Sequence, residues 1–332
     1  MNRIILTLLS GVALTGIATA QQDVTLNFQA LIGDQAAACG VTYDGVGAES
    51  SQIEVQDLRF YVSNLRLLNA AGEEVPLALT RDGQWQYENV ALLDFEDGSA
   101  RCAESGNAAM NTQVTGTVPE GEYTGLVYTV GVPFALNHAD VATAPAPLNV
   151  SSMWWNWQAG YKHMRIDLMS HSAATNMAAA EETGEHGDAE TDAEETGEHG
   201  AEETAGHGDA GGETGGDAEG AAGGHGAVPA GLWPIHLGST GCVSDSGAVA
   251  PAAACAHPNV FEVRLDGFNP ETDLVVADLS GLLNGVDLSQ SLELAPPGCM
   301  SGGDDPDCSA LFTNLSLTQG ADAQTFFRSE AR

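Results

Sequence analysis

Three of the chain's five tryptophans lie within four residues, between Met153 and Gln158. Side chains alternate between the two faces of an extended strand, so Met153, Trp155 and Trp157 would share one face and Trp154 the other. Thioethers and imidazoles are ligands that suit copper. Aromatic packing in a core strand accounts for any single tryptophan equally well. The segment is thus a candidate for copper chemistry and also for a core strand.

Histidine is the second residue type that could bind a metal here. His138 ends the sequence Gly-Val-Pro-Phe-Ala-Leu-Asn-His at the exit of an expected strand, and His236 lies in Trp-Pro-Ile-His-Leu-Gly-Ser-Thr-Gly-Cys. His163, His171 and His257 also lie in or near patterned sequence. Spacing alone does not join any two of these residues, and a lone histidine is more often structural.

Four further histidines lie in an acidic segment at 178–227, which is composed largely of Gly, Ala, Glu, Asp and Thr. The octapeptide AEETGEHG occurs at 180–187 and again at 193–200. Such a composition buries too little apolar surface to offset chain entropy, so we expect a disordered insert. A low-affinity cation buffer is an alternative use of its histidines, which are His186, His199, His207 and His225.

Charge and motif content limit the function. The formal net charge of −36 disfavours binding to nucleic acid or to anionic lipid. The chain has no GxSxG, HExxH or P-loop motif, so we expect a binding protein and not an enzyme. The acidic run at 302–307 has the composition of a calcium loop without EF-hand spacing. A secreted, calcium-stabilised adhesion or interaction module is therefore an alternative function.

The N-terminus predicts export. Residues 1–20 have a basic start at Arg3, a short apolar stretch and a small-residue end at Ala18-Thr19-Ala20, as in a signal peptide. No other segment is apolar enough to span a membrane, and we expect a periplasmic or secreted protein.

Six cysteines in an exported chain favour disulfide bonds over thiolate metal sites. The simplest pairing joins Cys242 to Cys255 and Cys299 to Cys308, which leaves Cys39 for Cys102. This is one of about 15 possible pairings.

The remaining sequence predicts strands. Alternating, β-rich segments occur at 52–68, 85–95, 121–132, 153–168, 232–237 and 260–268, separated by Gly-, Pro-, Asn- and Asp-rich turns. Short helical turns are expected at 280–284 and 304–312. We predict an all-β fold, an elaborated, disulfide-stabilised immunoglobulin-like β-sandwich. It forms a single domain over 21–332, interrupted by the insert at 178–227.

Six motifs in order along the chain carry a family resemblance. They are DLRFYVSN at 57–64, ALLDFE at 91–96, GVPF at 131–134 with Asn137-His138, the segment 153–162, HLGSTGC at 236–242 and PGCM at 297–300. With these motifs the chain resembles the metallo-mystery pair four-Cys motif family, which includes MbnP-like copper-binding proteins. The resemblance implies an exported β-sandwich that binds Cu(I) or Cu(II) and serves copper acquisition, storage or delivery.

The resemblance also implies a partner and site residues. The partner is a di-haem cytochrome c peroxidase of the MauG-like kind, which oxidises a tryptophan of the binding protein to kynurenine. Trp155 and Trp157 are the candidates for oxidation, His138 and His236 the copper ligands, and Met153 a third ligand suited to Cu(I). The sequence departs from the family pattern at Trp154, where a lighter aromatic residue is expected, and at His163, where an aromatic or aliphatic residue is expected.

Overall fold

The computed structural model describes residues 20–104, 108–172, 231–245, 249–289 and 298–332. The expected signal peptide, apart from Ala20, and the acidic insert lie outside these residues. In the part of the chain that is described, no helix has the length and apolar character needed to cross a membrane.

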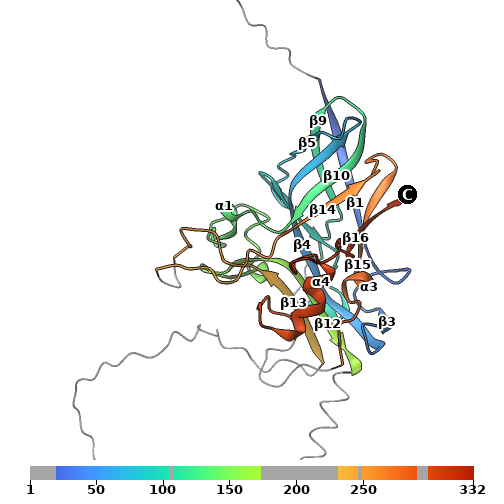
Figure 1. Cartoon of the computed structure of the whole chain (residues 1–332), viewed down its shortest axis with the longest axis vertical. Helices are drawn as coiled ribbons and strands as arrows, with labels where there is room; N and C mark the ends of the chain where they lie inside the picture. Colours follow the sequence, from blue (N-terminus) through green and yellow to red (C-terminus); the bar gives the residue numbers. More distant parts are fainter. Residues whose placement is uncertain (1–19, 105–107, 173–230, 246–248, 290–297) are drawn as a thin grey trace, which may run out of the picture.

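Two β-sheets pack face to face, which confirms the predicted sandwich (Figure 1). The smaller sheet has six strands, with β1 paired parallel to β15 and antiparallel to β9. Its order is β16 (Phe327–Ala331), β15 (Asp273–Asp278), β1 (Gln21–Ile32), β9 (Gln113–Pro119) and β6 (Ala78–Leu79), with β2 (Gln35–Ala36) beside β1.

The larger sheet has ten strands around the long strand β4 (Ser51–Asn69). Its order is β11 (Trp154–Asn156), β12 (Gly160–Ser170), β4, β10 (Tyr123–Val130) and β14 (Phe261–Asp266). Strand β13 (Leu232–Gly238) pairs with β12, and β7 (Gln86–Tyr87) pairs with β8 (Val90–Asp94). Strands β3 (Thr42–Val46), β5 (Glu74–Pro76) and β8 pair with β4.

The main core lies between the two sheets. Alternate residues of β4, including Leu58, Phe60 and Val62, belong to this core and are fully buried. The Phe60 ring contacts the Phe327 ring of β16, with centroids 5.4 Å apart. Burying one face of a strand in this way selects its alternating sequence.

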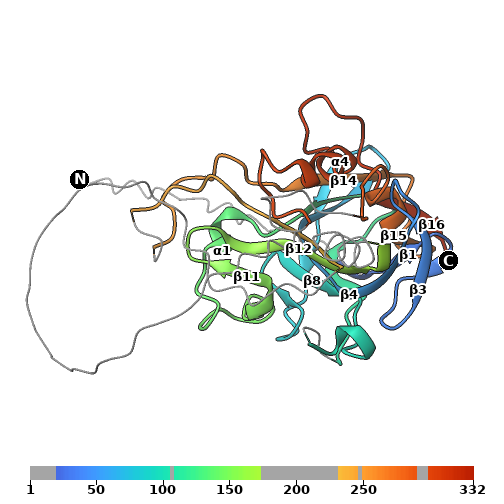
Figure 2. The same cartoon turned by 90° about the horizontal axis from the view of Figure 1, so that it is seen from below.

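A second, smaller core covers the other face of the larger sheet. Tyr61 is adjacent to Phe60 in β4 and belongs to this second cluster, together with Leu92, Leu148 and Met153. The segment that covers it runs from 131 to 159 and includes α1 (Phe134–Asn137) and η2 (Ser151–Met153). In Figure 2, α1 and β11 lie at one end of the molecule, and β3 and β16 lie at the other.

The three disulfides are those of the simplest pairing: Cys39–Cys102, Cys242–Cys255 and Cys299–Cys308. Cys102 lies in η1 (Ala100–Glu104). The expected helical turns are also present, as α3 (Leu279–Leu282) and as η3 (Pro306–Cys308) followed by α4 (Ser309–Asn314).

Two expected strands are wrong in their extent. The segment 85–95 forms a hairpin, because a turn at 88–89 separates β7 from β8. The segment 153–168 is not continuous, because a turn at 157–159 separates β11 from β12. The Asn156 side-chain oxygen accepts hydrogen bonds from the backbone amides of Gln158 and Ala159, at 2.9 and 2.7 Å, which bends the chain. Met153, Trp155 and Trp157 therefore do not form one face of a strand. Instead, the rings of Trp154 and Trp157 contact each other edge to face, 5.8 Å apart.

Candidate metal and tryptophan site

His138 has the local environment of a metal ligand. It is buried just after α1, and its Nδ1 lies 3.2 Å from the carbonyl oxygen of Trp157. A carbonyl oxygen only accepts, so Nδ1 carries the hydrogen and the lone pair is on Nε2. Burial lowers the pKa of His138, although the hydrogen bond to Trp157 opposes this effect. A neutral imidazole fixed through its other nitrogen is typical of metal-binding histidines.

The Nε2 atom of His138 lies where three parts of the chain meet. The amide nitrogen of Asn137 is 3.4 Å away, and Sγ of Cys255 is 3.8 Å away. Asn137 is itself held, because its side-chain oxygen accepts from the Tyr161 amide at 3.0 Å and its amide nitrogen lies 3.3 Å from Ser239 Oγ. The Phe134 ring packs against the imidazole at 5.2 Å.

Both candidate tryptophans lie at this end of the molecule. Trp157 supplies the carbonyl that His138 binds. The Trp155 ring packs against Gly238, whose neighbour Ser239 contacts Asn137. Both indoles are partly buried. The backbone of Trp157 thus contacts His138 directly, whereas no described contact joins either indole ring to the imidazole.

Met153 and His236 have different surroundings. Met153 is fully buried in the second core, among residues such as Leu92 and Leu148. His236 Nε2 lies 2.7 Å from a carboxylate oxygen of Asp167. Among the described contacts, none joins Met153 or His236 to His138, so their roles as ligands stay predictions.

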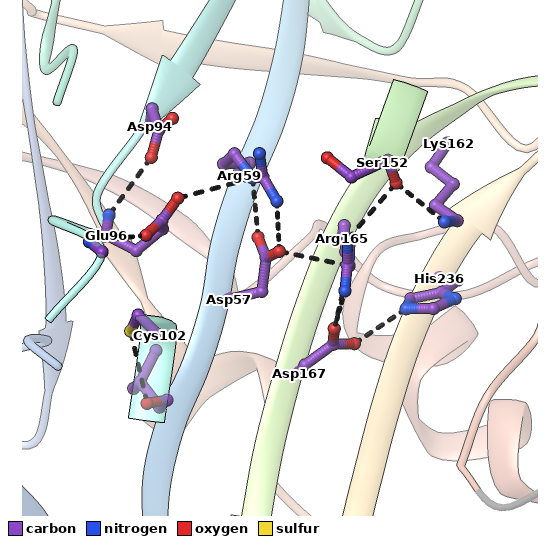
Figure 3. A network of polar contacts seen from close by, with 12 residues as sticks. Asp57, Arg59, Asp94, Glu96, Cys102, Ser152, Lys162, Arg165, Asp167 and His236 are labelled. Carbon is purple, nitrogen blue, oxygen red and sulfur yellow. Dashed lines mark hydrogen bonds and ion pairs between the residues drawn. The ribbon is translucent and has the colours of Figure 1, made fainter. Parts of the chain in front are cut away.

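His236 belongs instead to a buried network of charged residues, shown in Figure 3. Strand pairing places Asp57 opposite Asp167 and Arg59 opposite Arg165. Arg165 contacts both aspartates, at 3.2 Å to Asp57 and 2.6 Å to Asp167.

The charges around His236 are of both signs. Burial lowers its pKa, the hydrogen bond and charge of Asp167 oppose this effect, and the cations of Lys162 and Arg165 add to it. Burial also lowers the pKa of Lys162, to about 8. At His236 the Asp167 carboxylate already occupies the Nε2 side of the ring, and the two cations would oppose a bound metal ion. Nε2 of His138 has no cationic neighbour among its described contacts.

Comparison with known proteins gives the family. A family model described as MbnP matches residues 21–301. The chain belongs to the MbnP family. A solved structure, MbnP from Methylosinus trichosporium, aligns with a TM-score of 0.69 and 30% sequence identity, over 94% of this chain and 99% of that chain. Among curated proteins, no sequence matches significantly. The resemblance set out from the motifs is therefore confirmed at the level of the family.

The structure explains one of the two departures from the MbnP pattern, the histidine at position 163. It is fully buried on β12, where its Nδ1 accepts from the Val132 amide at 3.2 Å. Its Nε2 lies 3.1 Å from the carbonyl oxygen of Pro258 and donates to it. Both ring nitrogens are thus satisfied within the protein, and burial lowers the pKa of His163 to about 4. In this MbnP-family chain, His163 is a neutral structural residue.

This pKa predicts a loss of stability at acid pH. An unfolded histidine binds a proton near its ordinary pKa of 6.5, whereas folded His163 does so only near pH 4. The unfolded state therefore binds more protons between these values, and the free energy of unfolding falls as the pH falls. His163 should account for about 3 kcal/mol of the fall in the free energy of unfolding between about pH 7 and about pH 4. Urea unfolding at these two pH values measures the total fall.

His163→Phe should remove most of that pH-dependent share, whatever its effect at neutral pH. The exposed His257, changed to Gln, is the matched control and should retain the full dependence. Equal pH dependence in wild type and His163→Phe would contradict the assignment.

Gly238 positions Trp155. A Cβ atom at Gly238 would lie 2.4 Å from Cζ3 of Trp155, so an added methyl group must displace the indole. We expect Gly238→Ala to destabilise the fold by about 1–3 kcal/mol and to shift the tryptophan fluorescence. Gly303→Ala is the control, because nothing lies within 4 Å of a Cβ there. Identical spectra and stabilities for the two variants would rule out this packing.

The acidic run at 302–307 borders a cavity of about 520 Å³ at the far side of β13, lined by residues that include Trp233, Asp287 and Asp307. Burial raises the pKa of Asp307 to about 6, and the charges of Asp305 and Asp287 add to the effect. One carboxylate oxygen of Asp307 is buried without a hydrogen-bond partner. Carboxylate oxygens are ligands that favour a hard cation.

Proposed function

We propose that this MbnP-family protein is an exported copper-binding protein, not an enzyme, that serves copper acquisition, storage or delivery. The observation that carries the proposal is the geometry of His138, whose Nδ1 is fixed by the Trp157 carbonyl and whose Nε2 lone pair, among the described contacts, has only long contacts with Asn137 (3.4 Å) and Cys255 (3.8 Å). Membership of the MbnP family supports copper as that metal.

The chemistry of this imidazole fits copper. Its lowered pKa keeps the lone pair available at neutral pH, when an ordinary histidine is partly protonated. Imidazole binds both Cu(I) and Cu(II). His236 has only Nδ1 left for a metal, because Nε2 faces Asp167. We therefore place His138 at the centre of the site.

A competition titration tests copper binding. Oxidised protein with all three disulfides intact is titrated against a chromophoric Cu(I) chelator, and we expect it to withdraw about one equivalent of copper. Protein lacking residues 178–227 should withdraw the same amount. Loss of binding on that deletion would favour the cation buffer in the insert, and no withdrawal by the full chain would contradict the proposal.

We further propose that a di-haem peroxidase matures the protein by oxidising Trp155 or Trp157 to kynurenine. An indole offers only an N–H donor, whereas kynurenine exposes an aryl amine and a carbonyl that a metal can bind. Two equivalents of peroxide insert two oxygen atoms across the C2–C3 bond of the indole and are themselves reduced to water. A water molecule then hydrolyses the resulting N-formyl group, whose carbon leaves as formate. The contact of the Trp157 backbone with His138, and the packing of the Trp155 ring on Gly238 next to Ser239, support this step.

Intact mass tests maturation. Protein co-expressed with a MauG-like di-haem peroxidase should be heavier by about 4 Da than protein expressed alone, since the net change is one oxygen gained and one carbon lost. Peptide mapping should place the change at Trp155 or Trp157. Unchanged mass in the presence of an active peroxidase would contradict this part of the proposal.

A calcium-stabilised interaction module is the second candidate, favoured by the unpartnered carboxylate oxygen of Asp307 and its two acidic neighbours. Calcium bound there would raise the melting temperature. Asp307→Asn should abolish that rise. A rise with calcium and none with copper would favour this function over copper binding.

A further inference from the structure

The disulfide Cys242–Cys255 lies directly beside the imidazole of His138. A ring nitrogen of His138 and the two sulfur atoms all lie within 4.8 Å of one another, and Nε2 is 3.8 Å from Cys255 Sγ. While the disulfide is intact, neither sulfur carries a thiolate charge, and the pair is a poor metal ligand. Reduction would change two inert sulfurs into two soft ligands next to an imidazole.

The other disulfides of the described residues lack this arrangement. Cys39–Cys102 has the Glu96 carboxylate as its third neighbour, a hard ligand, and no histidine. Cys299–Cys308 belongs to neither three-ligand group found among the described residues. Only Cys242–Cys255, of these three, combines two sulfurs with an imidazole.

Cys242–Cys255 is more exposed than Cys299–Cys308. Its cysteines are 7% and 6% exposed, whereas both cysteines of Cys299–Cys308 are 1% exposed. The residues near Cys242 are open to solvent, with Val243 82% exposed. Thiol–disulfide exchange requires a thiolate to reach a sulfur atom, so access favours Cys242–Cys255 over Cys299–Cys308. In Cys39–Cys102, Cys39 is more exposed still, and the imidazole of His138 is what sets Cys242–Cys255 apart from that pair.

We propose that reduction of Cys242–Cys255 creates a Cu(I) site formed by the two thiolates and Nε2 of His138. An external dithiol gives two electrons to the disulfide and becomes a disulfide itself, which leaves two thiols. Each thiol then loses its proton as it binds copper, and the copper remains Cu(I) throughout. In the cell, a thioredoxin-like oxidoreductase is the class of protein that supplies the dithiol.

The chemistry of the ligands explains why copper would be held more tightly after reduction. Thiolates are soft donors that favour Cu(I) over harder cations. Two negative charges also offset the charge of the ion. The proposal uses the same histidine as the proposed function but does not depend on it, because the reduced site supplies two ligands of its own.

A Cu(I) competition titration of reduced and oxidised protein tests the proposal. The protein is reduced with dithiothreitol, freed of reductant without oxygen, and titrated beside oxidised protein. We expect reduction to raise the affinity for Cu(I) by at least about a hundredfold. X-ray absorption should show sulfur ligands in the reduced form. Equal affinities, or copper without sulfur ligands, would overturn the proposal.

Matched double variants identify the cysteines. Reduction of the Cys242→Ser/Cys255→Ser variant should not raise its affinity for Cu(I). Reduction of the Cys299→Ser/Cys308→Ser variant should still raise it. If the first variant does not fold, protection from alkylation provides the answer in wild type: Cu(I) should protect Cys242 and Cys255 and leave Cys299 and Cys308 reactive. Protection of the wrong pair would contradict the site. Failure of the proposed function is distinguishable, since it would appear in the oxidised protein.

Discussion

Arg59→Met is expected to lower the free energy of unfolding by about 3–5 kcal/mol, because it removes the cation from a buried group of carboxylates. Arg59 is 1% exposed and forms an ion pair with Asp57, which is fully buried. Its Nε lies 4.0 Å from Glu96, which is also fully buried, and the charge of Asp94 acts on it as well. In Arg59→Met these carboxylates would stay buried without the positive charge of the Arg59 guanidinium.

Urea denaturation of wild type and Arg59→Met measures the effect. Arg264→Met is the matched control, because Arg264 is 45% exposed and pairs with Glu74 and Asp266 at the surface. An exposed ion pair contributes at most about 1 kcal/mol. Similar losses in both variants would mean that the network in Figure 3 does not stabilise the larger sheet.

His138→Ala is expected to weaken Cu(I) binding by at least about a hundredfold in the oxidised protein, because it removes the imidazole nitrogen whose tautomer is fixed for a metal by the Trp157 carbonyl. A competition titration measures the change. Circular dichroism checks that the variant remains folded, since His138 also bonds to the Trp157 carbonyl.

Two further variants serve as comparisons for His138→Ala. His257→Ala removes an exposed imidazole and should leave the affinity unchanged. His236→Ala should retain most of the affinity, because Nε2 of His236 is bound to the Asp167 carboxylate and the ring belongs to the buried charge network. A loss with His236→Ala equal to that with His138→Ala would show that both histidines bind the metal, as the sequence alone predicted.

The strands of the sandwich could be predicted because burial of one face leaves an alternating pattern in the sequence. β4 shows this in Leu58, Phe60 and Val62, which belong to the main core. The disulfides could be predicted because two pairs are close in sequence. The break after β11 could not be predicted from alternation. It depends on the Asn156 side chain bonding to Gln158 and Ala159, and on Gly160, which has φ 82°.

The position of His236 could not be predicted for a related reason. Its neighbours depend on the pairing of β12 with β13, which places Arg165 opposite His236 and includes an irregularity between Lys162 and Met164. A single sequence does not give that register. The alternation of Asp57 with Arg59, and of Arg165 with Asp167, within apolar strands was the signal that could have indicated a buried charge network.

An anomalous-scattering crystal structure of the copper-loaded, oxidised protein tests most directly whether His138 binds the metal. Data collected at the copper absorption edge should show a single strong peak in bonding contact with Nε2 of His138, at the end of the molecule that carries Trp155 and Trp157. A peak at Asp307, or at His236 with none at His138, would contradict the copper site proposed for this protein.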